Sequence, residues 1–262
     1  MDNAMISECC NRTSLGLALI KAEAQAAKTH LFALWDRMPG DKYGGTQSMV
    51  EYAKTRPQGV EIVPLDALLP QNPQPKTETR PTPGQQICAM LFADVAGFSK
   101  INEAQLPNFR KIYLEPLARL IESSQPSLLL EYNTWGDGLF CVFADMESAG
   151  RFALSMQEMI GSRNPAAYGL PASFGLRISL HAGPVYEIND PILKKPSHIG
   201  THVNFAARIE TKTPIGHVYC SQTFAAMATA EGAKGFECEY ADEIQLPKTF
   251  GTHMVYVVRR KG

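Results

Sequence analysis

Several features that would place a chain in a specialised class are missing from this sequence. No apolar run approaches the roughly 18 residues that a membrane-spanning helix needs. The opening MDNAMISECC lacks the basic and apolar regions of a signal peptide. The six cysteines form no C-x-x-C pair and no zinc-like spacing. These absences predict a soluble protein without a membrane span, in a reducing, cytoplasmic compartment.

An excess of charge is missing as well. The formal net charge is -1, from 25 basic and 26 acidic residues. This balance argues against a surface that coats nucleic acid or adheres strongly to a membrane. The hydrophobic fraction of 45% and the charged fraction of 19% are those of a globular protein. A chain of 262 residues can form one large domain, or a medium domain with an appendage.

Proline is concentrated in one stretch that divides the chain. PQNPQPKTETRPTPGQQ, residues 70–86, holds five prolines and no large apolar residue, which is typical of a stiff, extended linker. The predicted organisation is therefore a small segment over 1–69, a linker over 70–86 and a larger domain over 87–262.

The first segment reads as a βαβ unit. Helical periodicity covers 13–28, followed by HLFALW, a buried-type strand over 30–35. A helix over 47–54, with Thr46 as its cap, precedes a strand over 60–63.

A glycine-rich loop lies before the second of these helices. Gly44, Gly45 and Thr46 have two readings: a loop that holds an anion on free backbone N–H groups, or ordinary helix caps. The segment resembles the second half of Rossmann-like nucleotide-sensing domains related to cytokinin-activating and DNA-processing proteins. Because the first half is absent, we expect this half-domain to dock on a neighbour or to be a remnant, and a lost or separately encoded partner is one reading.

In the larger domain, two aspartates stand at the ends of apolar strands. Asp94 closes ICAMLFADV and is followed by a tight loop and a long helix over 102–123, which we expect to kink or start late near Pro107. Asp137 lies between two glycines at the tip of the hairpin LLLEYNTWGDGLFCVF. Asp is also common as a helix cap and in hairpin turns, so each motif alone is weak.

Polar side chains also recur on a small-residue helix over 200–210. Asn204 and Arg208 are four residues apart and share one face, where an amide and a guanidinium can hold a sugar and a phosphate. A surface polar pair is the alternative. His181, within the strand over 174–186, is favoured as a core histidine.

Four stretches, taken in order, resemble one family. They are LFADVAGFS, EYNTWGDGLFCVF, LRISLHAGPVY and GTHVNFAARIE. They are similar to the motifs of class III nucleotidyl cyclase catalytic domains, and the match covers about residues 87–259. The resemblance implies an α+β fold with a ferredoxin-like βαββαβ core. It also implies a homodimer, with each active site shared between two head-to-tail copies.

The family also implies roles for single residues. Asp94, Asp137 and the Val95 carbonyl would bind two Mg²⁺ or Mn²⁺ ions per site, hard cations that prefer oxygen ligands. Asn204 and Arg208 would act in catalysis, on the ribose and the α-phosphate. The expected phosphate-binding residues are Val95, Ala96, Gly97, Phe98, Ser99 and, with a looser local match, Lys248.

The base-reading positions depart from the family's pattern. Adenine is read there by Lys and Asp, and guanine by Glu and Cys; this chain has Asn133 and Ser197. Some bacterial members that depart in this way are pyrimidine cyclases of antiphage systems. The sequence therefore leans slightly toward a nucleotidyl cyclase making cyclic CMP or cyclic UMP for a downstream effector. A cAMP-forming adenylate cyclase and a silent nucleotide-binding module are the alternatives. No GG-[DE]-E-F stretch of a diguanylate cyclase is present.

Overall fold

The computed structural model describes residues 3–35, 43–56, 58–64, 84–125, 127–247 and 250–261. The chain divides into two compact units: residues 1–87 with 226–232, and the remainder. Most of the predicted 70–86 linker lies outside the described residues, and the strand after it begins at Gln85 rather than Ile87. Within these residues, no helix is both long and apolar enough to cross a membrane.

The first unit contains the predicted βαβ arrangement. Its elements are α1 (Asn3–Ala24), β1 (His30–Trp35), α2 (Thr46–Lys54) and β2 (Gly59–Pro64). β1 and β2 pair in parallel, with His30 opposite Gly59. Two details of the prediction were wrong: α1 begins ten residues before Thr13, and Thr46 lies inside α2, whose N-cap is Gly45 with no side-chain hydrogen bond.

The burial predicted for β1 was also wrong. Phe32 and Leu34 are each 62% exposed, although Ala33 between them is buried. Alternate side chains of a strand point to opposite faces of the sheet. The one helix in the crossover can cover only one face of a two-stranded sheet. The side chains of HLFALW that point to the other face are therefore exposed.

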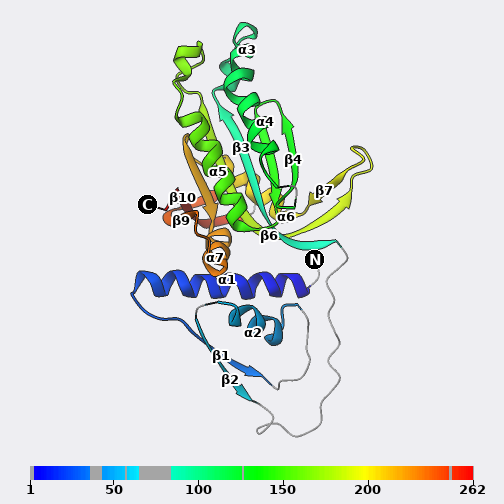
Figure 1. The fold of residues 1–262 in the computed structure, drawn as a ribbon, viewed down its shortest axis with the longest axis vertical. Helices are drawn as coiled ribbons and strands as arrows, with labels where there is room; N and C mark the ends of the chain where they lie inside the picture. Colours follow the sequence, from blue (N-terminus) through cyan, green and yellow to red (C-terminus); the bar gives the residue numbers. More distant parts are fainter. Residues whose placement is uncertain are drawn as a thin grey trace. The chain divides into compact units, whose positions relative to one another are not determined.

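The second unit is built on an eight-stranded sheet with the order β4-β5-β3-β6-β8-β10-β9, in which β7 pairs with β6 (Figure 1). The strands are β3 (Gln85–Ala96), β4 (Leu129–Trp135), β5 (Gly138–Phe143), β6 (Gly175–Asn189), β7 (Pro196–Ile199), β8 (His217–Ser221), β9 (Phe236–Leu246) and β10 (Gly251–Arg260). The helices are α3 (Leu106–Phe109), α4 (Glu115–Glu122), α5 (Met146–Gly161) and α6 (Thr201–Glu210), while α7 (Gln222–Glu231) starts in this unit and belongs from Ala226 onward to the first. Its first half follows the chain order β3-helix-β4-β5-α5-β6 with the spatial order β4-β5-β3-β6. This is the ferredoxin-like α+β core, and the predicted fold is confirmed.

The long helix predicted over 102–123 is interrupted. A 3₁₀ turn over Glu103–Gln105 leads into α3, whose first turn contains Pro107. A π-helical turn over Arg110–Leu114 then precedes α4. Pro116 lacks an N–H and clashes with the preceding turn, so the regular hydrogen-bond ladder cannot run through it. The late start near Pro107 agrees with the sequence; the second break does not.

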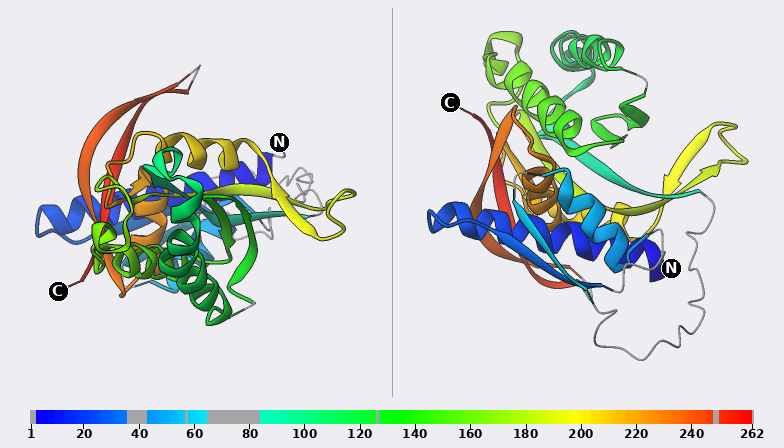
Figure 2. Two further views of the ribbon diagram at one scale, coloured as in Figure 1. Left: turned by 90° about the horizontal axis from the view of Figure 1, so that it is seen from above. Right: turned by 60° about the horizontal axis from the view of Figure 1, so that its bottom comes forward.

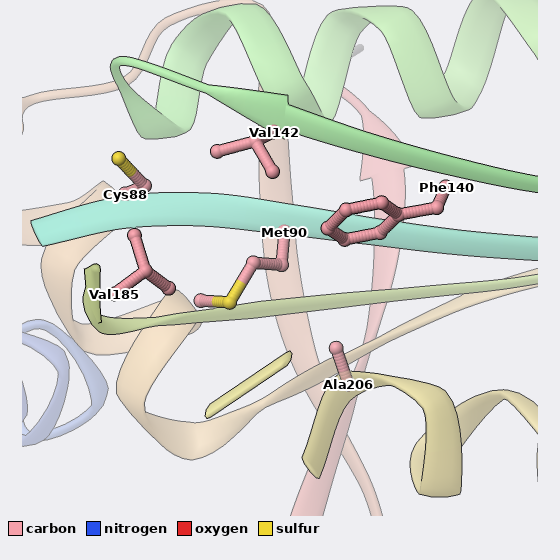
Figure 3. Close-up of a cluster of buried hydrophobic side chains, with 6 residues drawn as sticks. All are labelled: Cys88, Met90, Phe140, Val142, Val185 and Ala206. Carbon is pink, nitrogen blue, oxygen red and sulfur yellow. The ribbon is translucent and has the colours of Figure 1, made fainter. Parts of the chain in front are cut away.

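The core between the sheet and α6 positions the strands that carry the two aspartates. Side chains from β3, β5, β6 and α6 meet there (Figure 3); they are Cys88, Met90, Phe140, Val142, Val185 and Ala206. Every residue of β5 is buried. Strands covered on both faces require such continuous apolar runs. The sheet therefore holds β3 and β5 rigidly in antiparallel register, with Ala93 opposite Leu139.

Two features project from this unit, a tight turn and an arm. The β4–β5 turn consists of Gly136 and Asp137, since Trp135 pairs with Gly138. Gly136 has φ 78°, while Asp137 is not among the residues of positive φ, a pattern typical of a type II′ hairpin turn. The end of β6 and β7 form an arm that extends from the sheet (Figure 2).

Candidate active site

Asp94 and Asp137 come together at one end of the β3–β5 ladder. Asp94 follows Ala93, and Asp137 lies two residues before Leu139, the strand partner of Ala93. Burial raises the pKa of Asp137, and the nearby Asp94 carboxyl raises it further, although the Asp137 backbone N–H acts to lower it. The two carboxyl groups are therefore close enough to repel each other when both are ionised.

A third side chain, Arg177 on β6, supplies positive charge at this point. Its guanidinium Nη2 donates a hydrogen bond to Oδ2 of Asp94. Its Nε lies 3.0 Å from Oε1 of Glu210 at the end of α6. Sequence reasoning placed Arg177 in the strand without giving it a role and did not single out Glu210. The arginine within LRISLHAGP was the available signal.

Glu210 has the most unusual carboxyl of this cluster. Burial raises its pKa to about 7, and the Arg177 charge opposes that rise, while Asp94 and Asp137 add to it. Three carboxyl groups thus lie near a single guanidinium. Positive charge in addition to that of Arg177 would therefore stabilise their ionised forms.

The residues at this end of the sheet suit hard divalent cations. Within the described part of the chain, no group of three or more His, Cys, Asp or Glu side chains forms a ready-made metal site. Two carboxylates that repel each other, at the end of a strand that also carries the Val95 carbonyl, nevertheless offer the oxygen ligands that Mg²⁺ and Mn²⁺ prefer. A triphosphate would have to complete such a coordination shell, because Mg²⁺ is usually bound by one or two carboxylates together with substrate phosphates.

The loop after Asp94 differs from the expected helix start. Val95 and Ala96 still belong to β3, and Gly97 adopts φ 84°. Phe98 and Ser99 begin a three-residue 3₁₀ turn rather than the long helix. The positive φ of Gly97 favours glycine, and a Cβ there would stand 2.8 Å from Oγ of Ser173, whose side chain would have to rotate away.

Asn204 and Arg208 lie one turn apart on α6, as the spacing predicted. Asn204 is exposed and Arg208 is partly buried. The Arg208 guanidinium carbon lies 4.1 Å from the Phe250 ring centroid, and Nη1 donates to the Pro247 carbonyl at 3.3 Å. Lys248 lies outside the described residues. No hydrogen bond or ion pair among the described residues joins this pair to Asp94 or Asp137.

The two predicted base-reading residues lie on β4 and β7. Asn133 is partly exposed on β4, and Ser197 is partly exposed on β7. The Ser197 hydroxyl donates to Oε1 of Glu131 at 3.0 Å. Glu131 also bonds to His198, and both of their side chains are less than 5% exposed. Sequence reasoning missed this pair, although Glu131 lies two residues before Asn133 and so on the same face of β4.

Beneath α6, His181 has the core role that the sequence favoured. It is 3% exposed. Its Nδ1 lies 2.7 Å from Oγ of Ser221, and its Nε2 lies 2.8 Å from Nδ1 of His202. Burial, and then the neighbouring His202 and His253, hold the pKa of His181 well below its ordinary value. The ring is therefore neutral in the folded protein.

This neutral histidine predicts acid sensitivity. The folded pKa is lowered, so the unfolded chain binds more protons below about pH 6.5, and stability falls as the pH falls. We expect His181 to reduce the free energy of unfolding by about 1.4 kcal/mol between about pH 7.5 and pH 5.5. Denaturant unfolding at several pH values should show this slope shrinking in His181→Gln and unchanged in the exposed control His217→Gln. An equal slope in all three proteins would contradict the assignment.

In the first unit, the glycine loop before α2 faces an anion of the chain's own. The Gly44 N–H donates to Oε2 of Glu8 at 3.0 Å, and the Ser48 hydroxyl donates to the same oxygen. Arg12 pairs with the other oxygen at 2.9 Å. Burial acts to raise the pKa of Glu8, but these hydrogen bonds outweigh it and lower the pKa. The carboxylate of Glu8 thus occupies the position at which the sequence allowed an external anion to bind. Nucleotide sensing by this segment stays a prediction.

Known proteins resemble the part of the chain that contains most of the second unit. The model of the adenylate and guanylate cyclase catalytic domain family matches residues 81–260. No curated protein matches the sequence. The adenylyl cyclase CyaB of P. aeruginosa is 16% identical, with a TM-score of 0.57 over 68% of this chain and 96% of that one.

Two further structures have a comparable likeness to this chain. The guanylate cyclase domain of RhGC from Catenaria anguillulae, in complex with GTP, is 22% identical, with a TM-score of 0.53 over 68% of this chain and 99% of that one. The guanylyl cyclase domain of the RhoGC fusion protein of Blastocladiella emersonii, a non-canonical dimer, is 21% identical, with a TM-score of 0.53 over 68% and 99%. At these low sequence identities, the comparison shows that this chain shares the fold of the three structures and nothing beyond the fold.

Proposed function

The chain belongs to the adenylate and guanylate cyclase catalytic domain family, and on this premise we propose that it converts a nucleoside triphosphate into a 3′,5′-cyclic monophosphate and pyrophosphate. In this reaction the ribose 3′-oxygen bonds to the α-phosphorus, the 3′-hydroxyl proton is lost, and the bond from the α-phosphorus to the bridging oxygen breaks. The observation that carries the proposal is the convergence of Asp94 and Asp137 at one end of β3 and β5.

Each element of the site then has a task. Asp94, Asp137 and the Val95 carbonyl would hold the cations. When bound, Mg²⁺ or Mn²⁺ lowers the pKa of the 3′-hydroxyl and neutralises the triphosphate. The Asn204 amide would orient the ribose, and the Arg208 guanidinium would bind the charge that develops on the α-phosphate.

The phosphates have their own proposed binding residues. The loop from Val95 to Ser99 would contact the β- and γ-phosphates with its backbone N–H groups. Gly97 allows a close approach there because it has no side chain. Lys248 is proposed to bind the terminal phosphates through its ammonium group.

Two copies of the chain would form two complete sites. No hydrogen bond or ion pair among the described residues joins Asn204 or Arg208 to Asp94 or Asp137, which supports a site that draws one pair from each copy. Exposed apolar side chains on β4 and on the β6–β7 arm offer a surface for a second copy. They are Tyr132, Trp135, Ile192, Leu193 and Ile199.

The identity of the base is a finer part of the proposal. Asn133 and Ser197 are neutral, and neither the Lys–Asp pair nor the Glu–Cys pair that reads a purine in this family is present. We propose cyclic CMP or cyclic UMP as the product, acting on a downstream effector in antiphage defence, with cAMP as the alternative. Protection of host cells in a phage challenge that is lost with Asp94→Ala would test the defence role.

A direct assay tests the activity. Purified protein is incubated with ATP, GTP, CTP and UTP in turn, with Mn²⁺, and the products are separated by chromatography. We expect a cyclic monophosphate from at least one nucleotide and none from Asp94→Ala. If the dimer is intact and no nucleotide is cyclised, the alternative of a nucleotide-binding module without turnover replaces the proposal.

A further inference from the structure

A buried carboxylate ties the two strands that carry the proposed base-reading residues. Glu131 on β4 is 6% exposed. Its Oε2 accepts the His198 backbone N–H at 2.6 Å and lies 2.9 Å from Nδ1 of the same residue. Its Oε1 accepts the Ser197 hydroxyl at 3.0 Å. Lys195 adds a longer bond, 3.5 Å, from Nζ to the Tyr132 carbonyl. The β6–β7 arm is thus held against β4 by named hydrogen bonds.

These bonds determine whether the Ser197 hydroxyl can donate or only accept a hydrogen bond from a ligand. An ionised carboxylate has no hydrogen and only accepts, so each of its three partners must donate. Burial acts to raise the pKa of Glu131, but the bonds from His198 and Ser197 outweigh it and lower the pKa, which keeps the group ionised. A serine has one hydroxyl hydrogen. Because that hydrogen is directed at Glu131, Ser197 offers only lone pairs to a ligand.

Asn133 completes the pattern. It lies two residues after Glu131 on the same face of β4, and none of the hydrogen bonds among the described residues involves its side chain. Its carboxamide carries both a donor and an acceptor and can rotate to present either one. The pair therefore presents a fixed acceptor at Ser197 and an adaptable group at Asn133.

We propose that Glu131 and His198 are positioning residues for base selection, which fix Ser197 as an acceptor so that the site prefers bases with an amino group at purine C6 or pyrimidine C4. This inference rests on the proposed function, in which Asn133 and Ser197 face the base. Adenine and cytosine carry an amino group beside an unprotonated ring nitrogen, so Ser197 accepts from the amino group while Asn133 donates to the ring. Guanine and uracil present an oxygen in place of that amino group, and its lone pairs meet those of Ser197. Among the purine nucleotides the site therefore prefers ATP to GTP, and among the pyrimidine nucleotides it prefers CTP to UTP.

The test compares all four nucleotides in the full-length protein. We expect kcat/KM for ATP over GTP, and for CTP over UTP, to favour the base with an amino group at purine C6 or pyrimidine C4 by about tenfold or more, the cost of leaving one polar group unpaired. Dissociation constants for the same nucleotides, measured on Asp94→Asn with Mn²⁺, give the preference without turnover.

Glu131→Gln is the informative variant. Its amide oxygen still accepts from His198, and its amide nitrogen donates to Ser197, whose hydroxyl hydrogen is released toward the base. Both ratios should fall to about one or reverse, which a merely structural role would not produce. Ser197→Ala should also bring the ratios toward one while leaving the Glu131–His198 pair in place. The matched control is Glu237→Gln, an exposed carboxyl on β9, which should keep the ratios of the unaltered protein.

The outcomes separate this inference from the proposed function. A preference for GTP or UTP, or ratios unaffected by both Glu131→Gln and Ser197→Ala, would overturn the inference and leave the cyclase proposal standing. Tighter binding of ATP and CTP without turnover supports the inference and overturns the cyclase proposal. If none of the four nucleotides binds, both are overturned. Should Glu131→Gln fail to fold, as judged by thermal unfolding, Ser197→Ala alone decides.

Discussion

Mixing Asp137→Ala subunits with Arg208→Ala subunits is expected to restore cyclase activity that neither variant shows alone. Each single change should lower kcat by about 10²–10³-fold, as removal of one group that stabilises developing charge does in other enzymes. In a shared-site dimer, a mixed pair contains one site with both defects and one intact site. Random exchange at equal concentrations gives half mixed dimers, so activity should recover to roughly a quarter of the unaltered level.

The chain offers a matched control for this experiment. Asp94→Ala and Asp137→Ala remove two ligands of the same proposed metal site, which one copy supplies, so their mixture contains no intact site. It should remain inactive. Differently tagged subunits that co-purify show that mixed dimers form. If they form and the Asp137–Arg208 mixture stays inactive, or if the control mixture recovers equally, the active site is not shared between copies.

Arg177→Gln is expected to destabilise the protein by about 2 kcal/mol in the presence of a chelator. The change leaves Asp94 and Glu210 without the guanidinium that now neutralises them. Removal of one partner from a fully buried pair costs about 3–5 kcal/mol; the effect here should be smaller for two reasons. The Asp94 side chain is 28% exposed. Glu210, whose pKa burial already raises to about 7, can take up a proton.

Divalent cations should then stabilise this variant more than the unaltered protein. Mn²⁺ bound at Asp94 would replace the missing positive charge, so Tm measured with and without Mn²⁺ should rise more in Arg177→Gln. Arg259→Gln is the control, because its ion pair with Glu239 has side chains 59% and 49% exposed and should be worth less than about 1 kcal/mol. Equal Tm values with and without Mn²⁺ in Arg177→Gln would argue against cation binding at Asp94.

Local patterns explain why much of the second unit was predictable. Two apolar strands around Gly136 and Asp137 allow little except a hairpin, since a tight turn needs a residue of positive φ. Four motifs in order identify the family and, through it, the order of strands. The kind of break at Arg110–Leu114 was missed because a π-helical turn depends on how Pro116 is accommodated, which periodicity does not report.

The sequence by itself determined the chemistry that is available: the types and spacing of Asp94, Asp137, Asn204 and Arg208, and the neutral residues at the proposed base-reading positions. Only the tertiary structure decided which charges meet. Arg177 lies 83 positions from Asp94, and Glu131 lies 66 positions from Ser197. Pairings over such separations depend on sheet order and on the packing of the β6–β7 arm. The acceptor role of Ser197 toward a ligand is therefore a property of the fold, because a hydroxyl can no longer donate to a ligand once its single hydrogen is donated to another group.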